Sequence, residues 1–384
     1  MSVCRTCDFP AGADAEVLAY VLEQLKAAGI DQELEAVAVR MMADSRISRA
    51  EGTWRTYEPH LARWFAFCSQ AKAKPLGALG VVASLFLQLT FEDARTRGIG
   101  PQAVEKASAA ISALHELVGA QSPCVGTQCD SVREVARRTL VGTRLDREPA
   151  TADDIRLLVD THLVEGVSLD TRMMVTCAAL CFAGLLRYSD LARVMVHYDL
   201  MRFYGDRVEL YLFASKTDQH WRGAFVPIGR VGGKYCPVHL LEELLRAGNY
   251  TQRPATRESV AADGTVCVEE VEDVGPLLRA VSAVNGGQRL RRQAVVLPEL
   301  IEPIAYGTFS RKLKHLFKEA GVTKQIGTHS LRSGGASEAV ANGADRAVVQ
   351  KTGRWRSPKV FESCYVHESG AQKRRVTLCM GLGG

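Results

Sequence analysis

The sequence predicts a mainly α-helical protein with one small antiparallel β-sheet. Apolar residues recur at three- and four-residue steps through most of the first 145 residues, which is the period of a helix buried on one side. Only one place alternates as a hairpin does: Val208–Phe213, followed across a polar turn by Ala224–Ile228. With 384 residues, 47% of them apolar and 24% charged, the chain has the composition of a globular protein of two or three domains.

The pattern along the first 145 residues predicts a succession of helices. Gly29 ends the first helix, and Asp31 caps the second. The third carries a one-sided stripe that includes Trp54, Tyr57 and Trp64, and we interpret this stripe as core rather than as a binding surface. The expected helices cover Ala15–Ala28, Asp31–Met42, Ser48–Phe67, Leu79–Ala94, Ala103–Val118 and Val132–Leu140.

A break in the pattern at residues 144–149 predicts a linker, after which Thr151 caps a new helix. A strongly apolar helix follows at Leu169–Phe182, and the predicted hairpin comes next. Residues 249–300 show no clean period, so we expect an insertion or a mobile segment there, before helices return from Thr308 onward. The expected domains are an N-terminal helical extension (1–45), a helical domain (46–145) and a larger domain (146–384).

Several classes of protein are excluded by the same composition. The longest apolar run, Met173–Leu186, is shorter than the roughly 20 residues of a membrane-spanning helix, and no secretory leader is visible. We therefore expect an intracellular protein without a membrane partner. The chain has 11 cysteines, which we expect to be reduced. Cys4 with Cys7, and Cys236 with His239, resemble halves of zinc sites, but neither has a second half, so we expect no metal.

Positive charge is concentrated at the C-terminal end. The formal net charge is +5, and the chain from residue 301 onward holds 14 Lys and Arg against 6 Asp and Glu. That end therefore carries a surplus of 8, and the first 300 residues carry about −3. A basic block on a near-neutral body indicates a polyanionic partner, with nucleic acid the foremost candidate. A solvated charged surface explains the same excess equally well.

The densest cluster of polar residues is Thr328–Gly335 (THSLRSGG). His329 and Arg332 are three residues apart, so on a helix both project from one face. The same spacing occurs at His60 and Arg63 within a segment that we interpret as structural, so the spacing alone indicates nothing. The first pair gains significance because it lies inside the basic block.

Four further segments accompany this cluster. In chain order, the five are Gly184–Leu191 (GLLRYSDL), Ala214–Asp218 (ASKTD), Thr328–Gly335, Gly353–Pro358 (GRWRSP) and Glu362–His367 (ESCYVH). Together they resemble the tyrosine recombinase, or phage integrase, family. Their motif sequences are closest to those of recombinases of eukaryotic Crypton- or DIRS-like mobile elements. The resemblance implies a catalytic domain at 146–384 and a helical DNA core-binding domain at 46–145.

The resemblance also implies a catalytic set. Tyr365 would attack a DNA phosphodiester, because a phenol becomes a competent nucleophile once neighbouring cations lower its pKa. Arg187 and Arg332 would hold the non-bridging oxygens in their planar guanidinium forks. Lys216, on the hairpin turn, would protonate the leaving 5′ oxygen. Each has a plainer alternative, and that of Lys216 is the ordinary solvated lysine of a turn.

Three residues complete this set. His329 would accept or relay the proton of the tyrosine, and Trp355 would donate its indole N–H to the phosphate. Trp355 also fits a purely structural role in the core. Asp190 follows Arg187 by three residues and would orient that arginine or His329.

We therefore expect a site-specific DNA recombinase or integrase that works through a 3′-phosphotyrosyl intermediate, without metal or cofactor. Its partners would be double-stranded DNA and further copies of itself, in a tetramer on DNA. We expect it in the nucleus of a eukaryotic host and otherwise in the cytoplasm. Arg133, Arg137 and Arg138 would grip DNA phosphates. The alternatives are a type IB topoisomerase-like enzyme and a domesticated, catalytically inert DNA-binding protein.

Overall fold

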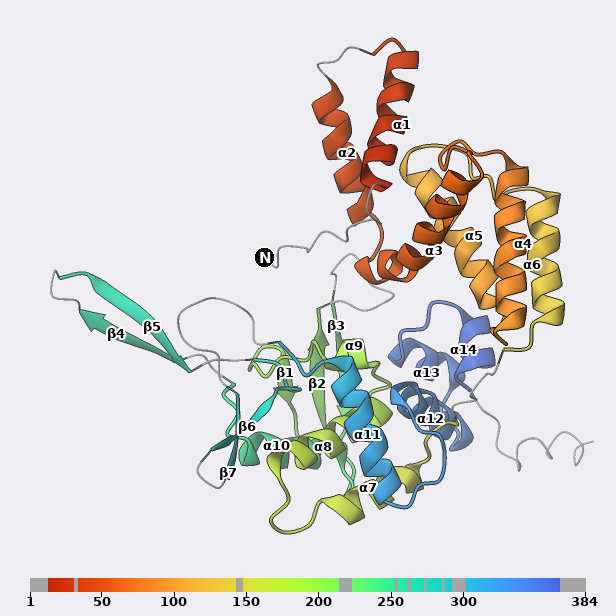
Figure 1. The fold of residues 1–384 in the computed structure, drawn as a ribbon. Helices are drawn as coiled ribbons and strands as arrows, with labels where there is room; N and C mark the ends of the chain where they lie inside the picture. The colour runs from red at the N-terminus through yellow and green to blue at the C-terminus, as the bar shows by residue number, and fades with distance from the viewer. Residues whose placement is uncertain are drawn as a thin grey trace, which may run out of the picture. The chain divides into compact units, whose positions relative to one another are not determined.

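A computed structural model gives the structure of most of the chain (Figure 1). It divides into two compact units, Met1–Arg144 and Leu145–Gly384. No helix of the described part combines the length and the apolar character that a membrane span needs. The described residues are 13–30, 34–142, 148–213, 223–252, 255–260, 264–272, 275–284, 287–291 and 302–366.

The described part of the first unit is helical, as predicted. Trp64 is fully buried on α3, with its ring centroid 5.3 Å from that of Phe86 and 6.0 Å from that of Phe67. The aromatic stripe is therefore core, as the sequence indicated. The helices are α1 (Ala13–Ala27), α2 (Glu35–Ile47), α3 (Glu51–Gln70), α4 (Gly80–Thr96), α5 (Gln102–Leu117) and α6 (Thr127–Thr139).

The second unit is built around α8, whose side chains are buried along nearly its whole length. Thr151 caps α7, as predicted: its hydroxyl accepts from the backbone N–H of Asp154, whose carboxylate in turn accepts from the backbone N–H of Thr151. The helices are α7 (Ala152–His162), α8 (Leu169–Ala183), α9 (Tyr188–Leu191), α10 (Pro237–Ala247), α11 (Tyr306–Glu319), α12 (Thr328–Ala341), α13 (Arg346–Thr352) and α14 (Pro358–Cys364).

The predicted hairpin is confirmed as an antiparallel pair, β2 (Arg207–Leu212) and β3 (Ala224–Gly229), with Leu210 opposite Val226. The first strand of the sheet, β1 (Met201–Phe203), pairs with β2 and was not predicted. Alternate residues of β2 are buried, which is the pattern of a sheet covered on one face.

The prediction of a single sheet was incomplete. Two further hairpins, β4 (Ala255–Val260) with β5 (Val266–Glu272) and β6 (Val281–Val284) with β7 (Gly287–Leu290), occupy the tract that showed no clean period. Between them, Leu277 is fully buried, and the backbone N–H of Leu277 donates to the carbonyl of Val194. This part of the tract belongs to the core of the unit. Its apolar run is too short to display any periodicity in the sequence.

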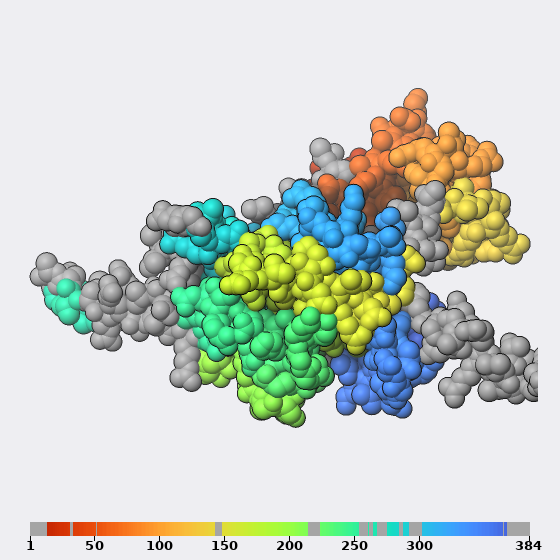
Figure 2. All heavy atoms as spheres, turned by 90° about the horizontal axis from the view of Figure 1, so that it is seen from below, coloured from red at the N-terminus to blue at the C-terminus, as the bar shows by residue number. Residues whose placement is uncertain are grey.

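Helix α11 lies against α7 and α8, as the space-filling view shows (Figure 2). Lys312 of α11 pairs with Asp170 of α8 at 2.6 Å, and the ring of His162 bonds the carbonyl of Leu316 at 2.8 Å. These contacts fix the end of α11 and hence the loop that leads into α12. The helix with the densest polar motif therefore starts from an anchored position.

Candidate active site

Helix α12 packs backbone to backbone against its neighbours. A Cβ atom added to Gly334 would lie 1.9 Å from the carbonyl oxygen of Ala150, and one added to Gly335 would lie 2.1 Å from that of Phe182. The backbone N–H of Ala150 also donates to the carbonyl of Ser330 on α12. Only glycine fits at these two positions, so the sequence THSLRSGG holds its His and Arg at a fixed depth in the unit.

Arg332 projects from α12 into the interior and is fully buried. Its Nη1 donates to the carbonyl of Leu185, and its Nη2 donates to the carbonyl of Gly353. Leu185 has a left-handed backbone, with φ of 50°, an uncommon conformation for a residue other than glycine. Arg332 thereby joins the end of α8 to the segment after α13.

Arg187 directly precedes the short helix α9, and Asp190 lies within it. The Asp190 carboxylate is fully buried, and its Oδ2 accepts from the backbone N–H of Arg187 at 3.1 Å. The guanidinium of Arg187 lies further away, with Nη1 3.8 Å from that oxygen. The carboxylate is therefore hydrogen-bonded to the backbone of Arg187 but not to the guanidinium group of Arg187.

Arg354 is a site residue that the sequence analysis did not single out. Its Nη2 donates to Asp190 Oδ2 at 2.9 Å, and its side chain is 14% exposed. Its backbone is left-handed, with φ of 60°. The motif GRW offered the only signal, an arginine beside the tryptophan, but neither its burial nor its backbone conformation is visible in the sequence.

Trp355 and Tyr365 lie face to face with Arg332. The guanidinium carbon of Arg332 is 4.0 Å from the centroid of the Trp355 ring and 5.6 Å from that of Tyr365. The two ring centroids are 4.8 Å apart, and Phe361 packs on Trp355 from α14. Tyr365 directly follows α14, where its carbonyl accepts from the hydroxyl of Ser337 on α12. The segments far apart in sequence thus converge on one place.

The electrostatics of this cluster are dominated by positive charge. Three guanidinium groups, those of Arg187, Arg332 and Arg354, face the single carboxylate of Asp190. Burial, together with repulsion from the other two arginines, lowers the pKa of Arg332, and burial is also the main cause that lowers the pKa of Arg354. The cluster therefore has a surplus of buried positive charge, which an anion would offset.

Among the buried donors of the cluster, those of three residues have no hydrogen-bond partner among the described residues. They are Nη1 of Arg187, Nε of Arg332 and the indole Nε1 of Trp355. Buried donors without acceptors are rare in folded proteins and are costly unless a ligand or solvent supplies the acceptor. Arg332 and Trp355 lie beside the Tyr365 ring, so an anion bound there would meet two of these donors.

The remaining predicted residues are placed differently. His329 lies in the first turn of α12 and is exposed, one helical turn before Arg332. Lys216 falls outside the described residues. Arg133 turns inward on α6, where Nη1 donates to Ser108 and to the carbonyl of Cys124.

Arg137 and Arg138 are exposed on α6 and pair with glutamates. Arg137 Nε lies 2.7 Å from Glu105, and Arg138 Nε lies 2.7 Å from Glu134. These two side chains reach solvent, so a phosphate can exchange for either glutamate.

The described residues offer no group of three or more His, Cys, Asp or Glu side chains placed to hold a metal ion. Cys236 is buried, and its Sγ accepts from the backbone N–H of Val231 at 3.4 Å. Cys4 and Cys7 fall outside the described residues.

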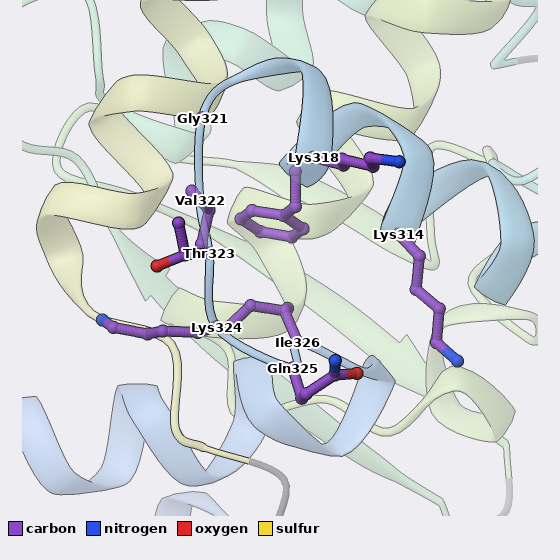
Figure 3. Close-up of a pocket in the computed structure, with 9 residues that line it drawn as sticks. Lys314, Lys318, Gly321, Val322, Thr323, Lys324, Gln325 and Ile326 are labelled. Carbon is purple, nitrogen blue, oxygen red and sulfur yellow. The ribbon is translucent and has the colours of Figure 1, made fainter.

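A separate pocket of about 560 Å³ lies where α11 ends and the loop to α12 begins (Figure 3). Lys324 extends to one side of it and pairs with Asp154 at 2.7 Å, whereas Lys314 and Lys318 extend to the other side (Figure 3). The pocket shares no lining residue with the tyrosine cluster.

Comparisons with known proteins bear on the fold and on one segment of the sequence. No curated protein matches the sequence. The XerH site-specific recombinase bound to palindromic difH substrate, in a post-cleavage complex, aligns with a TM-score of 0.55 and 11% identity over 96% of each chain. The pre-cleavage complex of XerH with difH gives a TM-score of 0.50 and 10% identity over 97% of this chain and 96% of that one. These likenesses confirm the predicted fold class.

Residues 264–372 match the sequence profile of the phage integrase family. The matched segment contains His329, Arg332, Trp355 and Tyr365, and it does not reach Arg187 or Lys216. This segment, less than a third of the chain, is therefore similar to the phage integrase family, and the chain has the fold of a solved site-specific recombinase.

Proposed function

We propose that this protein is a site-specific tyrosine recombinase that cuts and rejoins DNA through a 3′-phosphotyrosyl intermediate on Tyr365, without a metal ion. The observation that carries the proposal is the cluster of buried donors itself. Buried donors of Arg187, Arg332 and Trp355 lack hydrogen-bond partners among the described residues, and the cluster has more guanidinium groups than carboxylates. Arg332 and Trp355 lie beside the Tyr365 ring. A phosphodiester is the anion that fits such donors, because guanidinium groups bind phosphate oxygens through charge-assisted hydrogen bonds.

In the proposed reaction the Tyr365 oxygen attacks phosphorus, and the bond from phosphorus to the 5′ oxygen breaks. The electron pair of that bond leaves with the 5′ oxygen, which takes a proton from Lys216. His329 accepts the proton of the tyrosine. Arg187 and Arg332 stabilise the charge that develops on the non-bridging oxygens, and preorganised charge of this kind supplies the largest share of many rate enhancements. The reverse steps rejoin the strand without ATP, because the phosphotyrosine conserves the energy of the broken ester.

We propose a duplex DNA partner that is held partly by the first unit. Arg137 and Arg138 of α6 are exposed and are available to phosphates, whereas Arg133 is committed to Ser108 and Cys124. We further propose a tetramer on DNA, association with DNA in the cell, and an origin in a eukaryotic Crypton- or DIRS-like element. The residues of the motifs THSLRSGG and GRW support that origin.

The test is covalent capture on DNA. We would incubate the protein with nicked duplexes of randomised sequence, isolate adducts that survive denaturation, and sequence the attached DNA. The wild type is expected to yield adducts of one sequence class, and Tyr365→Phe is expected to yield none. An adduct of undiminished yield in Tyr365→Phe would remove this tyrosine as the nucleophile. Relaxation of supercoiled plasmids regardless of sequence would instead indicate topoisomerase activity.

A further inference from the structure

We propose that Arg354 is a positioning residue of this active site: it occupies Oδ2 of the Asp190 carboxylate, the oxygen nearest Arg187, and so leaves the guanidinium of Arg187 available to the DNA phosphate. The inference rests on the proposed function for its consequence in catalysis. Its structural part, the competition of two arginines for one carboxylate, stands on the geometry alone.

The distances define this competition. Asp190 Oδ2 accepts from Arg354 Nη2 at 2.9 Å and from the backbone N–H of Arg187 at 3.1 Å. Nη1 of Arg187 is 3.8 Å from the same oxygen, beyond hydrogen-bond distance, and has no hydrogen-bond partner among the described residues. Arg187 and Asp190 are three residues apart on one helical turn, a spacing at which an arginine and an aspartate ordinarily pair. Here Arg354 has taken that place.

Arg354 holds this place in an unfavourable setting. Its backbone is left-handed, and its side chain is largely buried beside two other guanidinium groups. A strained backbone and a buried charge both oppose folding, and such features persist where the surrounding structure imposes them, often at functional sites. The next arginine in the chain, Arg356, is exposed. An arginine in this segment can therefore reach solvent, and the burial of Arg354 is specific to its position.

Loss of Arg354 would leave the buried carboxylate with the backbone N–H of Arg187 as its one hydrogen-bond donor among the described residues, and with the Arg187 guanidinium 3.8 Å away. The groups around Asp190 are Arg187 on its own helix, Arg354 after α13 and Arg332 on α12. Both Nη atoms of Arg332 already donate to the carbonyls of Leu185 and Gly353. The guanidinium of Arg187 is therefore the group that closes on Asp190, and its donors are then withdrawn from the phosphate.

The first experiment needs no DNA. A crystal structure of Arg354→Met is expected to show Arg187 Nη1 within about 3.2 Å of Asp190, against 3.8 Å with Arg354 in place. An Arg187 guanidinium that stays at its present distance would overturn the inference. Because no substrate is involved, this result is independent of whether the protein cleaves DNA.

The second experiment measures single-turnover adduct formation on a captured nicked duplex. Arg354→Met is expected to slow the adduct rate about 100-fold, the scale of one lost donor to a transition-state charge, with an unchanged Kd for the duplex. Adding Asp190→Asn removes the negative charge that would attract Arg187. The double variant is expected to form the adduct at least about tenfold faster than Arg354→Met, because mutations of contacting residues are not additive. A purely structural Arg354 predicts no recovery, so a double variant no faster than Arg354→Met would contradict the inference.

Two controls complete the design. Arg156→Met, alone and with Asp153→Asn, alters an exposed pair of the same spacing on α7 and is expected to leave the rate unchanged. Arg354→Lys keeps the charge beside Asp190 and is expected to retain at least about a tenth of the wild-type adduct rate. It replaces Arg354→Met in this test if Arg354→Met does not fold. A lower rate in Arg354→Lys would overturn the inference. If the wild type forms no adduct while Arg187 closes on Asp190 in the crystal, the proposed function fails and the positioning contact stands.

Discussion

The arginines of α6 and those around Tyr365 are chemically the same side chain in opposite environments. The side chains of Arg137 and Arg138 are 53% and 76% exposed and share glutamate partners, whereas those of Arg187 and Arg354 are 11% and 14% exposed. Exposed ion pairs contribute little and are screened by salt. Buried guanidinium groups are held in place before substrate arrives, so no reorganisation is needed during the reaction. On the proposed function, we therefore expect the first set to contribute to affinity for DNA and the second to the chemical step.

The sharpest test of this comparison is Arg332→Lys. Lysine keeps the charge but cannot reach the carbonyls of Leu185 and Gly353 and the phosphate at once, because it lacks the planar fork. We expect adduct formation to slow about 1,000-fold in single-turnover assays, at the upper end of the loss of one oxyanion donor. Circular dichroism melting curves control for folding. A rate within tenfold of the wild type would break the comparison.

A smaller effect is expected from Trp355→Phe. Phenylalanine keeps a ring packed on Phe361 and Tyr365 but has no N–H to replace the buried indole donor. We expect adduct formation to slow about 10- to 100-fold with little change in thermal stability, as for the loss of one neutral hydrogen bond to a developing charge. The same assay measures it. An unchanged rate would assign Trp355 to the core alone, the alternative that the sequence left open.

The smallest effect is expected from Arg137→Gln combined with Arg138→Gln. Each exposed arginine that contacts a phosphate contributes about one unit to the slope of log Kd against log salt, so the double variant should bind several-fold more weakly, with a reduced slope. The adduct rate on saturating DNA should not change. Arg156→Gln on α7 is the matched exposed control. A slower rate at saturation would place α6 in the chemical step and remove the distinction.

Much of the fold was predictable because its signals are periodic and local. The α3 stripe around Trp64, the Thr151 cap and the β2–β3 hairpin each arise from a few neighbouring residues, and all three are present. The signal fails where burial depends on distant partners. Leu277 joins the core through a bond to Val194, and nothing in its neighbourhood of the sequence shows this.

The same limit applies to the site. The sequence motifs pointed to His329, Arg332, Trp355 and Tyr365. The structure brings the last three together. The roles of all four stay predictions. Arg354 was missed because its importance lies in its contact with Asp190, 164 residues away in the chain. Composition and spacing describe neighbours in sequence, whereas this contact exists only once α9 and the end of α13 meet in space.

The glycine pair of α12 has a consequence for how this enzyme tolerates change. Because Gly334 and Gly335 leave only main-chain atoms between α12 and its neighbours, the spacing there is set by the polypeptide backbone and not by any replaceable side chain. Substitutions elsewhere in the interior can alter size and shape while the separation of these two layers stays constant. The position of α12, and with it that of Arg332, is therefore expected to stay the same while the surrounding sequence changes.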